Sequence, residues 1–308
     1  MSIAVGEPAG IPTDPAEEVI FHKLAESVAQ GRCILFLGAG VHHAPPADSP
    51  YMYAEDERPP LGRELASKLA TECAFAKMCP GEQDSDLQRV ALCYEKILQR
   101  NALVEKIRHA VEDGTKPSAA LRGLAELPFP LVMTTNYDTL FERALRGVGK
   151  EPTIGIYDPE RYRRTPDLPG EWLPVPNTPF VFKAHGDITQ TNSIVVTDED
   201  YINFVLRMSA EGPESHPIPE TFRYWLNKWP TLFVGYRLLD FNLRLLFRTL
   251  RWNLDKAHRP NSYSVDVRPD PLVKDKWTEE HGLRFIVEDV WKFVPRLYRE
   301  VLGHELAP

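Results

Sequence analysis

The stretch Val132-Met133-Thr134-Thr135-Asn136-Tyr137-Asp138 decides the fold, because an apolar run passes directly into a group of hydrogen-bonding side chains. Two other segments have the same form. One is followed by a glycine-rich turn and the other by His185 and Gly186. A short apolar run bounded by turn residues is typical of a strand buried on both faces of a parallel sheet. We therefore predict such strands at Cys33–Leu37, Leu131–Thr135 and Phe180–Lys183.

The order of the predicted elements indicates the fold class. Strands alternate with apolar stripes at helical spacing, which is typical of an α/β protein. We expect a Rossmann-like, doubly wound parallel sheet with a smaller, mainly helical inserted subdomain. In such a sheet, ligands bind outside the carboxyl ends of the strands, so the polar groups at the three strand ends are expected to meet in one pocket. Further elements are predicted at Pro15–Ala29, Asp198–Leu206, Thr231–Val234, Ser262–Val267, Leu283–Val287 and Val290–Leu302.

The sequence predicts one domain with irregular insertions. Residues 1–14 are rich in proline, glycine and small side chains and predict a flexible lead-in. Residues 15–308 predict a single domain with helical or irregular insertions near 42–113, 150–178 and 198–230. Prolines exclude regular structure over residues 42–60, whereas 61–113 predict two or three helices. A long helix is expected after Thr231–Val234, with a core face of Leu239, Leu243, Leu246 and Leu250.

Composition excludes several classes of protein. The chain has 308 residues, 43% of them hydrophobic, which is enough for one substantial α/β core. Its net charge of −8 argues against general nucleic-acid binding, because phosphate neutralisation needs clustered lysine and arginine. There is no apolar run of about 18 residues. The first residues have neither the basic nor the apolar part of a signal peptide, so we expect no membrane span and a cytoplasmic location.

The four cysteines do not predict a metal site. They stand at Cys33, Cys73, Cys79 and Cys93, and no two are spaced as Cys-x-x-Cys. A structural zinc site normally needs four closely arranged Cys or His ligands. We therefore expect no bound metal, and Cys33, inside an apolar strand, is interpreted as a small core residue.

In their order along the chain, the three motifs resemble those of the sirtuin-like family. That family has a Gly-Ala-Gly turn, a Thr-x-Asn-x-Asp loop and a His-Gly loop, which here are Gly38-Ala39-Gly40, Thr134–Asp138 and His185-Gly186. The resemblance covers roughly residues 30 to 270. It is closer to the prokaryotic sirtuin-like branch that destroys NAD in antiviral defence than to the protein deacylases. The segments Ser193–Tyr201 and Val234–Leu243 match that branch, and the zinc ribbon of the deacylases is absent.

The resemblance implies a site that cleaves the nicotinamide–ribose bond of NAD+, with NAD+ as substrate and no metal. Such cleavage passes through an oxocarbenium-like state. The Asn136 amide oxygen would either stabilise the positive charge of that state or orient a water. His185 would accept a proton from a ribose hydroxyl or from an attacking water, since imidazole titrates near neutral pH. Asn136 and Asp138 would also hold the nicotinamide end. An alternative for both is capping the helix that begins near Thr139.

The remaining ligand contacts are expected from the glycine turn and two further strand ends. Gly38, Ala39 and Gly40 would let the backbone approach a diphosphate, although a tight turn alone would also explain the glycines. Thr135 stands where deacylases have Gln, so that ribose contact is not carried over. His42 replaces a small hydroxyl residue. His42 and His43 lie in a proline-rich loop, where we expect them at the surface, with metal binding as the alternative. The adenosine side is assigned to Gly235, Asp240 and Asp266, with helix capping as the alternative for Asp240.

Three functions remain open from the sequence. The first is an NAD+ hydrolase that depletes NAD+ in abortive-infection antiphage defence. The others are an NAD-dependent protein deacylase and a catalytically silent subunit that senses NAD or ADP-ribose.

Because an unrestrained NAD+ hydrolase would kill its host, activity must be gated. The catalytic fold uses nearly the whole sequence, so we expect the gate outside it. A homo-oligomer is expected. By resemblance, a separately encoded HerA/FtsK-type ATPase or an Argonaute-type protein would be the partner. Residues 42–60 and 160–164 are the segments expected to cover the pocket or bind that partner.

Overall fold

The computed structural model describes residues 15–159, 172–208, 218–237, 244, 246–247 and 260–308. The predicted lead-in 1–14 and the basic segment 160–164 lie outside the described residues. So does most of the long helix predicted after Thr231–Val234. Of its expected core face only Leu246 is described, and it is buried.

The described strands form one seven-stranded sheet in the order β3-β4-β2-β1-β5-β6-β7, and all of the pairings are parallel. β1 lies in the middle, with Ile34 beside Leu131 on one side and beside Thr231 on the other. The chain leaves β1 toward β2 on one flank and reaches β5 on the other, which is the arrangement of a doubly wound sheet. The predicted α/β fold class is confirmed. The strands are β1 (Ile34–Leu37), β2 (Leu131–Thr134), β3 (Thr153–Ile156), β4 (Phe180–Lys183), β5 (Thr231–Val234), β6 (Ser262–Val265) and β7 (Leu283–Ile286).

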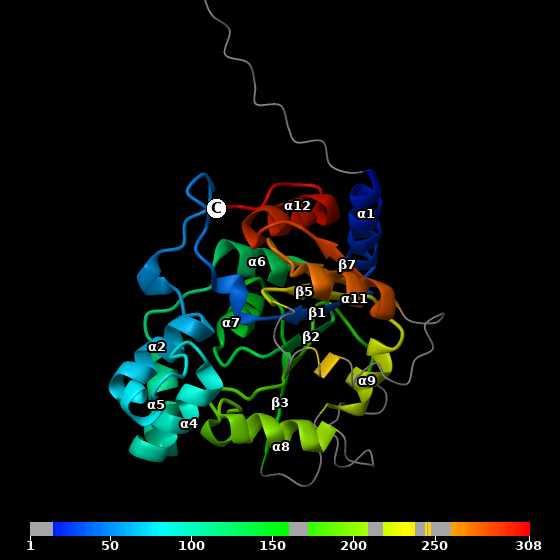
Figure 1. Cartoon of the computed structure of the whole chain (residues 1–308). Coiled ribbons are helices and arrows are strands. Elements are labelled where there is room, and N and C mark those ends of the chain that lie inside the picture. Colours follow the sequence, from blue (N-terminus) through cyan, green and yellow to red (C-terminus); the bar gives the residue numbers. More distant parts are fainter. Residues whose placement is uncertain (1–14, 160–171, 209–217, 238–243, 245, 248–259) are drawn as a thin grey trace, which may run out of the picture.

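Helices cover both faces of the sheet. Because successive side chains of a strand point to opposite faces, Leu35 and Leu37 of β1 pack into one core while Ile34 and Phe36 pack into the other. Figure 1 shows α1, α6 and α12 on one side of the sheet and α8 and α9 on the other. The first layer is α1 (Pro15–Ala29), α6 (Ala119–Glu126), α7 (Leu140–Gly147) and α12 (Val290–Leu302); the second is α8 (Asp198–Met208), α9 (Glu220–Leu226) and α11 (Pro271–His281).

A separate helical cluster follows β1 in the chain and has a hydrophobic core of its own. It is the cyan group at the lower left of Figure 1. The loop after β4 joins this core through Ile188, Ile194 and Val196, so the cluster borders the segment that follows His185. The helices are α2 (Gly62–Glu72), α3 (Phe75–Met78), α4 (Leu87–Leu98) and α5 (Arg100–Glu112). This cluster is the smaller helical subdomain that the sequence predicts.

Three regions differ from the sequence-based expectation, and the first is residues 61–113, which form four helices instead of the predicted two or three. Residues 150–178 were expected to be irregular, but Thr153–Ile156 form β3, which pairs with β4 at the edge of the sheet. A segment of four residues near prolines is too short to show a hydrophobic periodicity. It forms a strand because it pairs with β4. The helix α11 was also not predicted. Of its side chains only Trp277 is buried, so its sequence has no apolar stripe.

A contact between backbones joins the turns after β1 and β5. The Gly40 amide donates to Gly235 O at 2.8 Å. A Cβ atom on Gly38 or Gly40 would lie 2.6 or 2.7 Å from that same oxygen. Gly235 has φ +77°, and its own Cβ would lie 2.4 Å from Gly38 O. Glycine is therefore required on both sides of this junction by close approach, and at Gly235 also by the left-handed backbone.

We predict that Gly235→Ala lowers the free energy of unfolding by about 3 kcal/mol or more, because backbone strain and overlap add. Gly149→Ala is the matched control, since Gly149 has φ +78° but nothing within 4 Å of a Cβ. In Gly149→Ala the free energy of unfolding should fall by only roughly 1 kcal/mol. Urea unfolding followed by tryptophan fluorescence measures both variants. Equal losses would show that the junction contributes nothing beyond the strain of a positive φ.

Candidate active site at the carboxyl edge of the sheet

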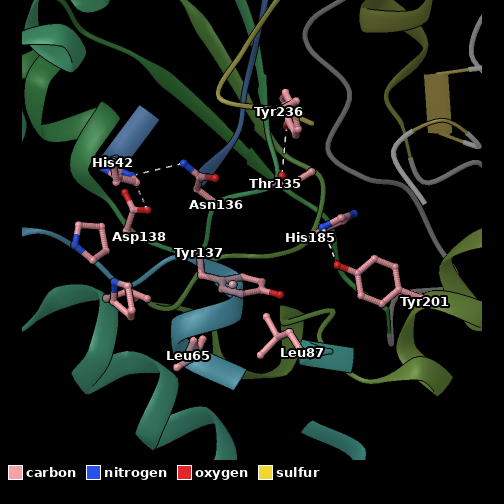
Figure 2. A pocket seen from close by; sticks show the side chains of 14 residues that line it. His42, Leu65, Leu87, Thr135, Asn136, Tyr137, Asp138, His185, Tyr201 and Tyr236 are labelled. Atoms are coloured by element: carbon pink, nitrogen blue, oxygen red, sulfur yellow. Dashed lines mark hydrogen bonds and ion pairs between the residues drawn. The ribbon is translucent and has the colours of Figure 1, made fainter. Parts of the chain in front are cut away.

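A cavity of about 140 Å³ opens at the carboxyl ends of β2 and β4, beside the helical cluster. Figure 2 shows Asn136, Asp138 and His185 around it, with Leu65 and Leu87 of the helical cluster on the opposite wall. The sheet edge therefore brings the Asn-Tyr-Asp loop and the His-Gly loop together, as the sequence predicts. The lining residues are His42, Pro59, Pro60, Gly62, Leu65, Leu87, Val111, Thr135, Asn136, Tyr137, Asp138, His185, Tyr201 and Tyr236.

Asn136 is held by the turn that ends β2. The Thr134 hydroxyl donates to Leu37 O at 2.8 Å and accepts from the backbone N–H of Asn136 at 3.0 Å. These two bonds turn the chain out of the sheet. The Asn136 side chain is 8% exposed, and its Nδ2 lies 3.5 Å from His42 Nε2. Its Oδ1 is buried and has no hydrogen-bond partner among the residues that the structure describes. Leaving a buried acceptor unsatisfied costs about 1–3 kcal/mol, so this oxygen is available to a ligand that donates a hydrogen bond.

Asp138 binds both the start of a helix and a histidine. One carboxylate oxygen accepts from the Leu140 amide at 3.0 Å at the start of α7, and the other lies 3.4 Å from His42 Nε2. Burial alone would raise the pKa of Asp138. His42, Lys183 and the Leu140 amide outweigh that effect and lower it. Asp138 therefore binds the first backbone N–H of α7, whose N-cap residue is Thr139, whereas Asn136 makes no such bond and lines the cavity.

The expectation that His42 lies at the surface is wrong. Its side chain is 3% exposed, and Nδ1 lies 3.4 Å from the Tyr53 hydroxyl, which in turn donates to Lys116 O. The proline-rich loop folds back over the turn after β1 and closes this side of the cavity. His43, by contrast, is exposed as expected. A run of prolines reveals that a loop is irregular but not which of its side chains point inward.

His185 follows β4 and is packed among aromatic rings. Tyr201 and Phe204 of α8 contact its ring edge-on, and its Nδ1 lies 3.3 Å from the Tyr201 hydroxyl. Gly186 next to it has φ +87°, and a Cβ there would lie 2.1 Å from Ser193 O, so the His-Gly turn requires glycine. Burial lowers the pKa of His185 to about 4. At neutral pH the imidazole is therefore uncharged and able to accept a proton.

A buried lysine at the end of β4 ties the two loops together. The Lys183 ammonium is 2.5 Å from Asp187 Oδ2 and 3.0 Å from Glu142 Oε1, and it donates to Asp138 O at 2.5 Å. Burial would lower the pKa of Lys183, but the neighbouring carboxylates outweigh it and raise it. The sequence analysis missed this role, although a lysine that ends the apolar run Phe-Val-Phe was a visible signal.

A second cavity of about 400 Å³ shares Tyr236 with the first. Two residues assigned to the adenosine side line it, namely Gly235 and Asp266, together with Gly40 of the glycine turn, and Asp266 comes directly after β6. The third residue assigned to the adenosine side, Asp240, lies outside the described residues. The two cavities lie along the carboxyl edge from β4 to β6, across the point where the strand order reverses.

The remaining predicted contacts are also located by the structure. The Gly38 and Gly40 amides already donate to Val234 O and Gly235 O, so the close contact with β5 explains the glycines without a phosphate. Ala39 begins the short 3₁₀ turn that leads to His42. The Thr135 hydroxyl donates to the Tyr236 hydroxyl at 3.1 Å, which places it at the border of the two cavities. The expected phosphate and ribose contacts stay predictions.

The described residues bring no group of three or more His, Cys, Asp or Glu side chains into an arrangement that could hold a metal ion. The absence of a metal stays a prediction. In the same part of the chain, no helix is both long and apolar enough to cross a lipid bilayer.

The fold and the paired loops define a known class of domain. The model of the SIR2-like domain family matches residues 130–286, just over half of the chain and the part that includes Asn136, Asp138 and His185. The chain belongs to this family.

The chain is similar to three proteins named NAD(+) hydrolase ThsA. The protein from Enterococcus faecium is 25% identical over 248 residues, covering 80% of this chain and 45% of its own length. The Acinetobacter baumannii protein is 21% identical over 305 residues, covering 92% and 56%. That of Cytobacillus dafuensis is 25% identical over 241 residues, covering 76% and 41%. The chain thus spans about half the length of these relatives.

The burial of His185 predicts a loss of stability in mild acid. The unfolded histidine takes up a proton near its ordinary pKa of 6.5, whereas the folded one does so only near 4. The free energy of unfolding should therefore fall as the pH drops from 6.5 to 4, by up to about 3 kcal/mol. Urea unfolding at pH 7 and pH 4.5 should show a smaller loss for His185→Gln than for the unsubstituted chain. Identical losses would mean that His185 is not held neutral.

Proposed function

We propose that this chain is an NAD+ hydrolase that releases nicotinamide and ADP-ribose. One observation carries the proposal. The Asn136 amide oxygen, buried and without a partner in the described part of the chain, lines the same cavity as the uncharged imidazole of His185. The membership of the SIR2-like family and the similarity to proteins named NAD(+) hydrolase support NAD+ as the substrate.

The Asn136 amide and the His185 imidazole suit a reaction that breaks a bond to a positively charged nitrogen. When the nicotinamide–ribose bond breaks, its electron pair goes to the ring nitrogen, so nicotinamide leaves uncharged and needs no general acid. Positive charge develops on the ribose, and the negative end of the Asn136 amide dipole stabilises it without reorganisation. Water then adds to the ribose carbon, and its proton passes to His185. The protein supplies a fixed dipole and a proton acceptor, and the reaction consumes one water.

The two adjoining cavities support a division of the substrate. The nicotinamide half would occupy the cavity with Asn136 and His185. The adenosine half would occupy the cavity with Gly40, Gly235 and Asp266. Tyr236, which lines both, would lie beside the linking phosphates and riboses. The expected antiphage role, NAD+ depletion in abortive infection, belongs to this proposal and is supported by the resemblance alone.

We predict that Asn136→Ala and His185→Ala each reduce NAD+ cleavage by about 10²–10⁴-fold, the usual loss for a positioned catalytic group. Chromatography of NAD+ incubated with the purified protein measures the product. Asn101→Ala and His304→Ala, at exposed positions, are the matched controls and should keep full activity. Turnover close to the unsubstituted level in a folded Asn136 or His185 variant would contradict the role of that residue.

The same assay separates the alternative functions. Nicotinamide formed without any peptide supports the hydrolase. Nicotinamide formed only with an acetylated peptide would make the chain a deacylase. No product under either condition, with NAD+ or ADP-ribose still binding in calorimetry, would favour a sensing subunit.

We further propose that the chain acts as a homo-oligomer of low basal activity that a partner stimulates. The support is physiological, because unrestrained NAD+ hydrolysis would kill the host. A HerA/FtsK-type ATPase and an Argonaute-type protein are the proposed partners, from the resemblance. Light scattering should give a multiple of 35.1 kDa, and an NAD+ assay should show stimulation when the partner is added. A monomer that hydrolyses NAD+ at full rate alone would contradict both parts.

A further inference from the structure

A third cavity lies at the opposite edge of the sheet from the candidate active site. Its volume is about 620 Å³, which is within the usual range for small-molecule sites. Arg32 lines it shortly before β1, and Pro230 lines it directly before β5. The cavity therefore lies at the amino ends of two neighbouring central strands, whereas the glycine turn and Gly235 follow their carboxyl ends.

Two tryptophans form an aromatic wall of this cavity. The ring centroids of Trp225 and Trp229 are 4.3 Å apart, with 37° between the ring planes. Both side chains are half-buried, because they pack against the core that includes Phe36 and also line the cavity. Aromatic side chains bind nucleic-acid bases by stacking, since every base has a π face. The wall thus offers a binding surface to a flat aromatic group.

Two cations line the same cavity, and none of its described lining residues is Asp or Glu. The Arg32 side chain is exposed and has no ion-pair partner in the described part of the chain. The Lys228 ammonium lies 4.0 Å from the centroid of the Tyr224 ring and donates to the Tyr224 hydroxyl, so its described partner does not neutralise its charge. The net charge of the chain is −8, yet this cavity is positive and favours an anion.

We propose that this cavity binds a nucleoside phosphate, because such a ligand combines a flat aromatic group with negative charge. The base would stack on Trp225 or Trp229, and the phosphates would accept from Arg32 and Lys228. A single nucleotide fits better than a nucleic-acid strand, since two cations would leave the phosphates of a strand without partners. The proposal does not rest on NAD+ hydrolysis, because no described lining residue is shared with the other two cavities.

Tryptophan signals locate the ligand in the whole chain. There are six tryptophans, so labelling with 5-fluorotryptophan gives six fluorine NMR signals, which single substitutions by phenylalanine assign. With ATP as the probe, we expect the signals of Trp225 and Trp229 to shift. Trp291 lines the second cavity and therefore reports on binding at the adenosine side of the candidate active site. A shift of the Trp291 signal alone, or no shift at all, would overturn the proposal.

Charge reversal tests the phosphate contacts. Arg32→Glu and Lys228→Glu should each weaken ATP binding in calorimetry by about 10-fold or more, since each removes a charge-assisted hydrogen bond. Lys77→Glu is the matched control, because it makes the same change of charge at an exposed position of the helical cluster. It should leave the affinity unchanged. Equal losses in all three variants would mean that net charge, and not this cavity, determines the affinity.

Fragments of the probe separate the aromatic contact from the ionic one. Adenosine and inorganic tripolyphosphate should each bind at least about 10-fold more weakly than ATP, because each keeps only one of the two contacts. Tripolyphosphate that binds as tightly as ATP would contradict the stacking on tryptophan. A single-stranded oligonucleotide that binds more tightly than ATP would reject the single nucleotide in favour of a strand.

Discussion

The site depends on one buried cation, the ammonium of Lys183. It stands at the end of β4 and contacts Glu142 on α7, Asp187 after the His-Gly turn, and the Asp138 carbonyl. Without this ammonium, the two carboxylates would be buried as unpaired charges. Removing one partner of a buried ion pair usually lowers the free energy of unfolding by about 3–5 kcal/mol. The Asn-Tyr-Asp loop and the His185 loop thus have their relative positions set by charge. The apolar sheet beneath supplies only the platform.

The polar side chains of the cavity are also held by hydrogen bonds to groups outside the cavity. His42 connects Asp138 and Asn136 to Tyr53, and the tyrosine hydroxyl donates to a backbone carbonyl. The Tyr137 hydroxyl likewise donates to a backbone carbonyl, that of Val195. Rigid groups cost little reorganisation when charge develops in a reaction, which is the usual origin of electrostatic catalysis. The Asn136 oxygen remains unsatisfied, and it lies in the same cavity as the His185 ring.

The sequence predicted well those elements whose signal is local. β4, β5, α1 and α12 begin and end where expected, because a buried parallel strand is a continuous apolar run and an amphipathic helix has a regular stripe. The strand β3 and the helix α11 escaped prediction for the opposite reason. β3 becomes a strand by pairing with β4, and α11 buries little beyond Trp277. Neither has a periodicity of its own.

By itself, the sequence determined the parallel sheet and the pairing of Asn136 with His185, since the strand ends of a doubly wound sheet must meet at one edge. Only the tertiary structure decided that His42 is buried against Asp138 and that the glycine turn packs on Gly235. It also decided that the Tyr201 hydroxyl lies beside His185. These contacts join residues that are far apart in the chain. Tertiary packing decides which of these residues meet, and a local sequence pattern does not contain that information.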